Sequence, residues 1–155
     1  RDVAPSRGLG DVYKRQLCER PQRPRPQIKL GSALRAAGAT SLNDVSDGLS
    51  SEINEIAKAS QVEIELFREK IPISAEAAKL GAYLAKDPVD WALTGGEDYE
   101  LIGTISEENF RKLDPSLPIS VIGQVVKAGR GCVYLSDREK RQKLAAKGYD
   151  HFSDE

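Results

Sequence analysis

Two apolar periods lie next to each other in the chain, and together they constrain its fold. Within residues 49–57, apolar side chains recur at i, i+4, i+7 and i+8, which places them on one face of an amphipathic helix. Residues 61–66 then alternate polar and apolar, with the two-residue period of a half-buried strand. A helix that leads directly into a strand predicts a layered fold in which helices pack on a sheet.

The rest of the chain supplies further elements of both kinds. Helices are expected where apolar spacing and capping residues agree, and strands where alternation is bounded by turn residues. The expected helices cover 28–37 with its end at Gly38, the segment that starts near 49, 75–85, and a short segment capped by Ser106. The expected strands cover 41–45, 62–66, 98–102 and two segments joined as a hairpin by a turn at 129–131. The predicted fold class is α+β, a mixed or antiparallel β-sheet with helices packed on it.

Length and charge exclude several classes of function. A chain of 155 residues suits one domain with its own core. It carries 23 basic and 24 acidic residues, a balance that predicts neither a nucleic-acid partner nor a membrane partner. The sequence contains no apolar run of the roughly 20 residues that a membrane span needs, and no secretory signal is recognisable. A cytoplasmic location is therefore expected.

The supply of nucleophiles and bases is small. His151 is the only histidine, so no mechanism that needs two imidazoles fits this chain. Cys18 and Cys132 are far apart and form no zinc-binding spacing, so both are expected to be free thiols. The chemistry must rest on carboxylates, hydroxyls and backbone amides.

The N-terminal part differs in composition from the rest. Residues 1–16 lack apolar periodicity and include GLGDVYKRQ, which resembles a peptide that recurs at the ends of translated metagenomic reading frames. They are expected to be a non-native or disordered tail. Residues 17–29 contain the proline-rich ERPQRPRPQ and are expected to form an arm or linker. The domain itself is expected over 30–155.

The stretch DVSDG places two carboxylates and a hydroxyl just before a helix. Asp and Ser at a helix start usually cap its free N–H groups, and the pattern alone favours that role. One such side chain is enough for a cap, whereas Asp44, Ser46 and Asp47 supply three. Carboxylate oxygens are the ligands that Mg²⁺ prefers, and a helix start offers N–H groups to phosphate. The surplus predicts a metal and phosphate site.

The stretch TGGEDYEL combines two glycines with three acids. We expect a glycine turn followed by a strand in which Tyr99 and Leu101 share one face. An acidic strand end exposed to solvent is the plain structural alternative. However, Asp and Glu are poor strand formers, and local rules are broken more often at functional sites. A carboxylate here could bind a metal, a cationic ligand or an amine.

The stretch GYDHF lies close to the end of the chain. Its aromatic residues could simply attach the tail to the core. They could also form a face on which a flat heterocycle stacks, with an added cation–π attraction when that ring is positively charged.

In this order, DVSDGL, TGGEDYEL and GYDHF resemble the C-terminal half of the thiamine-monophosphate kinase family. This family belongs to the ATP-dependent superfamily of aminoimidazole ribonucleotide synthetase. The resemblance runs from about Arg20, through the LGSALR segment, to Phe152. It implies a PurM-like C-terminal domain, without the N-terminal domain that supplies further metal ligands, most ATP contacts and the dimer interface. It departs from the family at Tyr149, where many members have Trp.

The resemblance also implies an activity and a set of site residues. The activity is transfer of the ATP γ-phosphoryl group to thiamine phosphate, with Mg²⁺ as cofactor, in a protein that is a homodimer at full length. Asp44 and Asp47 would bind Mg²⁺, Ser46 would contact ATP phosphate, and Glu97 and Tyr149 would contact the substrate. Alone, the fragment is expected to be inactive. Two alternatives remain open: a sister enzyme with another phosphate acceptor, or a binding module without catalysis.

Overall fold

A computed structural model describes residues 25–138 and 140–146. The helices in this part are α2 (Ile28–Ala36), α3 (Leu49–Ser60), α4 (Ala75–Leu84), α5 (Pro88–Thr94), α6 (Glu107–Phe110) and the 3₁₀ helix η1 (Arg68–Lys70). The strands are β1 (Ser41–Asp44), β2 (Val62–Phe67), β3 (Leu101–Thr104), β4 (Gly123–Ala128), β5 (Cys132–Asp137) and β6 (Lys140–Lys143). This mixture confirms the predicted α+β class.

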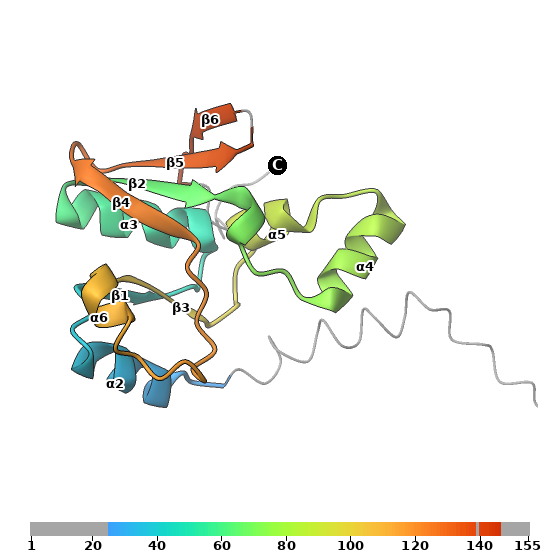
Figure 1. The fold of residues 1–155 in the computed structure, drawn as a ribbon. Helices are drawn as coiled ribbons and strands as arrows, with labels where there is room; N and C mark the ends of the chain where they lie inside the picture. The colour runs from blue at the N-terminus through green and yellow to red at the C-terminus, as the bar shows by residue number, and fades with distance from the viewer. Residues whose placement is uncertain (1–24, 139, 147–155) are drawn as a thin grey trace, which may run out of the picture.

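The elements form layers that alternate between strand and helix (Figure 1). One layer is a four-stranded sheet with the order β4-β2-β5-β6, and another is a two-stranded antiparallel ribbon of β1 and β3. Helix α3 lies between them and contacts β2 and β5 on one side and β1 and β3 on the other. Helix α2 lies along the opposite side of the ribbon.

Helix α3 forms the centre of the core. The predicted apolar face is confirmed, since Leu49, Ile53 and Ala57 are 7%, 2% and 0% exposed. Because the helix has a β layer on each side, polar residues of its first half are buried as well. Glu52 and Asn54 are among them. Asn54 Nδ2 donates to the carbonyl oxygens of Ser50, at 2.8 Å, and of Leu144, at 3.1 Å.

Strand β2 is one of the two inner strands of the larger sheet, together with β5. It pairs antiparallel with β4 and parallel with β5, so β4 and β5 lie on opposite sides of it. The predicted hairpin between these two strands is therefore wrong, and the turn at 129–131 crosses the end of β2. Burial agrees with this order. Leu66 of β2 and Val133 of β5 are 1% and 0% exposed, whereas Val125 of the edge strand β4 is 46% exposed.

The predicted end of α2 is confirmed. Gly38 has φ +85°, a left-handed conformation that glycine adopts without a steric penalty. Its N–H donates to the Arg35 carbonyl, and the Ala39 N–H donates to the Leu34 carbonyl. These two bonds form a Schellman motif, which satisfies carbonyls at the end of the helix.

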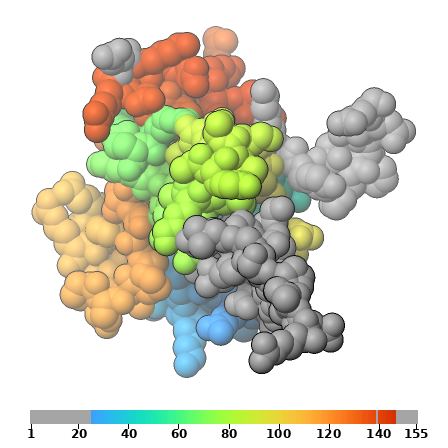
Figure 2. Space-filling model, turned by 90° about the vertical axis from the view of Figure 1, so that its right-hand side faces the viewer, coloured from blue at the N-terminus to red at the C-terminus, as the bar shows by residue number. Residues whose placement is uncertain are grey.

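Helix α5 was not predicted, although its start has two clear signals. Asp87 Oδ1 accepts a hydrogen bond from the Val89 N–H, and Pro88 occupies the first helical position. Helix α4 projects from the rest of the domain beside α5, and it faces the viewer in the space-filling view (Figure 2).

Within the described residues, none of the helices has both the length and the apolar character that crossing a membrane requires. Cys132 is a half-buried free thiol, as predicted. Cys18 and His151 lie outside the described residues, as does the segment 1–16.

Candidate functional site

The DVSDG motif forms the turn between β1 and α3. Asp44 ends the strand and Gly48 precedes the first residue of the helix. Gly48 has φ +99°, and a Cβ at this position would lie 2.9 Å from the carbonyl oxygen of Gly95. Only glycine tolerates both conditions. The DVSDG turn and the TGG turn therefore touch at this point.

Three backbone hydrogen bonds extend this contact. The Glu97 N–H donates to the Ser46 carbonyl at 2.7 Å, and the Tyr99 N–H donates to the Val45 carbonyl at 2.9 Å. In return, the Val45 N–H donates to the Glu100 carbonyl at 2.8 Å. Two motifs that are about fifty residues apart in the sequence are thus held side by side as one structural unit.

The predicted strand over 98–102 is only partly correct. Strand β3 begins at Leu101, because Glu97 and Tyr99 both have left-handed backbones, with φ of +67° and +52°. Tyr99 consequently does not alternate with Leu101 as a strand residue. Left-handed conformations of non-glycine residues cost on the order of 1–3 kcal/mol each and cluster at functional sites.

Glu52 is hydrogen-bonded to the DVSDG turn and to the strand that precedes it. Its side chain is buried, with 5% of the residue exposed. Its Oε2 accepts from Asn43 Nδ2 at 2.5 Å, and its Oε1 accepts from Ser46 Oγ at 3.3 Å and from the Asp47 N–H at 3.4 Å. Burial raises the pKa of this carboxyl, although the hydrogen bonds from Asp47 and Ser46 oppose that effect. One acid thus connects the strand and the turn.

Asp44 and Asp47 present their carboxylates at the surface. Both residues are exposed, and neither carboxylate has a hydrogen-bond or ion-pair partner in the part of the chain that the structure describes. The same part contains no group of three or more potential metal ligands. Mg²⁺ commonly takes one or two carboxylates and completes its octahedron with water and phosphate oxygens. The donor set present here fits that pattern.

The other predicted site residues have distinct surroundings. Ser46 is half-buried, and its hydroxyl donates to Glu52, so donation to a phosphate would require rotation of the O–H bond. Glu97 is exposed and lies next to Ser46 through the backbone bond given above. Tyr149 lies outside the described residues.

Sequence reasoning assigned no role to Glu52, although a signal was present. Positions 49, 52, 53 and 56 lie on one face of a helix, so an acid at 52 falls among core residues. A charged residue on an apolar helix face is rarely buried without partners. Its partners could not be identified beforehand, because two of the three are in the turn.

Fold and site together define a class of protein: an α+β domain in which an acidic strand–helix turn is held against a glycine-containing loop. The family model for "AIR synthase related protein, C-terminal domain" matches residues 5–136. The chain belongs to this family.

The similar proteins narrow the comparison further. The chain is 41% identical over 138 residues to the thiamine-monophosphate kinase of Bacillus subtilis (strain 168), which covers 86% of this chain and 41% of that protein. The thiamine monophosphate kinase from Aquifex aeolicus has a TM-score of 0.71 at 33% identity, over 80% of this chain and 40% of that one. The structure of AaThiL complexed with AMPPCP and TMP has a TM-score of 0.74 at 30% identity. The match covers 97% of this chain and 43% of that one. These matches confirm the resemblance, and the chain spans less than half the length of each of these relatives.

Proposed function

We propose that this chain is the C-terminal part of a kinase that transfers the ATP γ-phosphoryl group to thiamine phosphate and forms thiamine diphosphate. The observation that carries the proposal is the pairing of the DVSDG turn with the loop at 95–100, which gathers acids, a hydroxyl and a helix start. Thiamine-monophosphate kinases among its relatives, and the complex of AaThiL with AMPPCP and TMP, support the choice of substrates.

Each residue would have a separate task. Asp44 and Asp47 would hold Mg²⁺, which, when bound, neutralises charge on the phosphate oxygens. The Ser46 hydroxyl would contact ATP phosphate next to the start of α3, where backbone N–H groups favour anions. Phosphoryl transfer depends mainly on positioning and on charge stabilisation, so the scarcity of histidine and cysteine is compatible with it.

Substrate recognition would depend on opposite charge and on aromatic contact. Thiamine phosphate carries a cationic ring, which suits a carboxylate and an aromatic face. We propose that Glu97 supplies the carboxylate and Tyr149 the aromatic face. We also propose a homodimeric, cytoplasmic complete protein that has no nucleic-acid or membrane partner, since the balanced charge offers neither of them a complementary surface.

The test is a thiamine diphosphate assay on the complete polypeptide of which this chain forms part. Asp44→Asn and Asp47→Asn are each expected to lower kcat by roughly 10- to 100-fold or more, because each removes a ligand from the metal. Asp114→Asn is the matched control: this exposed acid lies after α6, accepts from the Ser116 N–H within its own turn, and should leave turnover nearly unchanged.

The same assay separates the alternatives. The 155-residue chain alone is expected to give no turnover. Product formation by the chain alone, or full activity of both Asp variants, would contradict the proposal. If Glu97→Gln and Tyr149→Ala leave the use of thiamine phosphate intact, the acceptor is a different molecule and a sister enzyme is the correct identification.

A further inference from the structure

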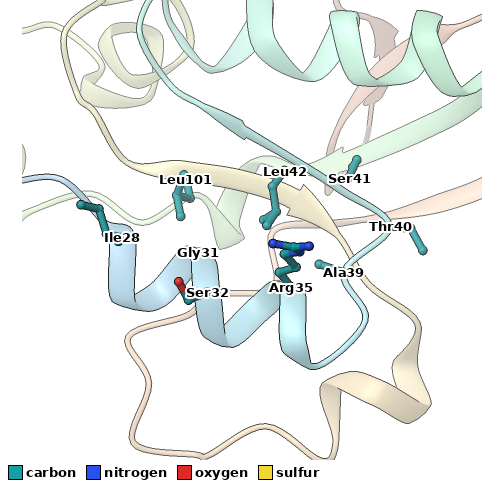
Figure 3. Close-up of a pocket in the computed structure, with 9 residues that line it drawn as sticks. All are labelled: Ile28, Gly31, Ser32, Arg35, Ala39, Thr40, Ser41, Leu42 and Leu101. Atoms are coloured by element: carbon teal, nitrogen blue, oxygen red, sulfur yellow. The ribbon is translucent and has the colours of Figure 1, made fainter.

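A groove runs between α2 and the β1–β3 ribbon and ends beside the acidic turn. Its first part, of about 460 Å³, is lined by Ile28, Gly31, Leu101, Tyr99 and, at the acidic end, Asp44. A second part, of about 510 Å³, shares the first three of these residues and continues along α2 (Figure 3). Both parts are open to solvent, so a small ligand could enter the groove from the surface.

The groove is open because of one glycine. Gly31 lies on the face of α2 that is turned toward the ribbon, and a Cβ there would already contact Leu101 Cδ1 at 3.4 Å. Leu101 points from β3 toward this face, and Ile28 stands at the start of the helix (Figure 3). Ile28 is 73% exposed, so the apolar surface that it adds to the groove is in contact with solvent.

Tyr99 supplies an aromatic wall next to the acid. The residue is 37% exposed, although its side chain is large and mostly apolar. Its left-handed backbone is held by its N–H donating to the Val45 carbonyl, so Tyr99 leaves the line of the strand and is one of the residues that line the groove. The fold thus maintains an unfavourable backbone conformation at a residue that faces a cavity, which is a pattern common at binding sites.

Charge and shape indicate one class of ligand. An exposed carboxylate at one end, an aromatic ring beside it and an aliphatic floor together complement a flat heterocycle that carries a positive charge. Glu100 lies beside this end, where its Oε2 accepts from Gln27 Nε2 at 3.3 Å. A long aliphatic chain would leave the Asp44 carboxylate without a counter-charge.

We propose that this groove binds flat aromatic cations and that Tyr99 is the residue that stacks on them. The assignment of the natural ligand rests on the function proposed above: the groove would hold the cationic part of thiamine phosphate, with its phosphate directed toward the Mg²⁺ that Asp44 would hold. Tyr99 then joins Glu97, two residues earlier in the same loop, in recognising the acceptor.

The test uses the 155-residue chain and thiamine without its phosphate, in the absence of metal. Two-dimensional amide NMR is expected to show shifts at Ile28, Gly31 and Leu101. Tyr99→Ala should weaken binding at least about fivefold, and Tyr99→Phe should retain it. Tyr83→Ala is the control, since this tyrosine of α4 is 76% exposed and lies outside the groove. Absence of shifts at millimolar ligand, shifts elsewhere, or equal binding by Tyr99→Ala would overturn the proposal.

A second arm with Mg²⁺ keeps the two proposals separate. A metal ion at Asp44 should weaken the binding of thiamine and strengthen that of thiamine phosphate, because only the latter carries a phosphate. If thiamine shifts the groove residues and Mg²⁺ changes neither affinity, the groove is supported and the metal site is wrong. If Mg²⁺ acts on thiamine phosphate but no groove residue shifts, the groove is wrong and the metal site is supported.

Discussion

At the scale of single residues, the site depends on an acid that would not itself contact a ligand. Glu52 accepts three hydrogen bonds from the strand and the turn that carry Asp44, Ser46 and Asp47. A buried carboxylate with both oxygens engaged is rigid, because moving it would leave donors unsatisfied. The positions of the candidate metal ligands therefore depend on the hydrogen bonds of Glu52.

Replacing Glu52 with Gln should lower the free energy of unfolding by about 1–3 kcal/mol. The NH₂ group of Gln would take the place of one carboxylate oxygen, so a donor that is now hydrogen-bonded to that oxygen would lose its acceptor. Urea denaturation at neutral pH measures this change. Glu55→Gln is the control, because Glu55 is exposed on the same helix. An equal effect of both variants would show that the loss comes from helix charge and not from the buried contacts.

The pH dependence of this difference has a defined sign. Burial raises the pKa of Glu52 above its ordinary value of 4.5, so the folded state binds the proton more tightly than the unfolded chain. The advantage of the wild type over Glu52→Gln should therefore grow as the pH falls through the raised pKa toward 4.5, and stay constant below that.

The sequence indicated which residues could bind ligands, but it did not indicate which residues hold them in position. Asp44, Ser46, Asp47 and Glu97 could be proposed because acids and a hydroxyl before a helix are unusual in that number. Glu52 could not be given partners, since its hydrogen bonds depend on how the turn folds. The roles proposed for these residues remain predictions.

At the scale of elements, one glycine allows two connections to touch. The β1–α3 turn meets the end of α5 and the loop that follows it at Gly48, where a Cβ would lie 2.9 Å from the Gly95 carbonyl oxygen. This contact, together with the three backbone bonds beside it, replaces the strand that periodicity predicted at Tyr99. Alternating residues indicate a strand only where the neighbouring backbone allows an extended conformation.

Gly48→Ala should destabilise the domain by about 2 kcal/mol or more, because the new Cβ combines an unfavourable φ with contacts to backbone atoms. Gly31→Ala is the control. Its Cβ would meet only Leu101 Cδ1, at 3.4 Å, so a loss below about 1 kcal/mol is expected. Thermal unfolding of both variants provides the comparison, and similar losses would contradict the proposed role of the junction.

Most elements were predictable, and the failures have physical causes. Helix α3 and strand β2 have strong periods of 3.6 and 2 residues, and both were found. Helix α5 is seven residues long, which is too short to show an apolar period. Only the N-cap residue Asp87 and Pro88 indicate it in the sequence. The order of β4 and β5 depends on β2, a strand far away in the sequence, and no local turn signal contains that information.

At the scale of the whole molecule, one arginine ties the large sheet to the helix that leads into the site. Arg68 follows β2 and pairs with Asp87 at the start of α5, with Asp90 at 3.8 Å and with Asp137 of β5 at 3.7 Å. Its side chain is 23% exposed, whereas its partners are more exposed. These pairs help to fix α5, and with it the loop at 95–100.

Arg68→Gln should lower stability by up to about 1 kcal/mol in low salt and by less in 1 M salt, since exposed partners and screening limit such pairs. Arg111→Gln removes an exposed pair with Glu107 on α6 and should have almost no effect. Urea denaturation at both salt concentrations tests this. A loss at Arg68 that does not change with salt would mean that packing, and not charge, is responsible.

The inner position of β2 also has a consequence for biosynthesis. Residues 129–131 must span two strand spacings, about 9.6 Å. The four Cα–Cα steps from Ala128 to Cys132 reach roughly 13–14 Å when extended, so the link covers this distance without full extension. In the sheet, β4 and β5 each pair with β2 and not with each other. On the ribosome, β2 emerges before both, so each of these strands has an edge of β2 to pair with as soon as it is made.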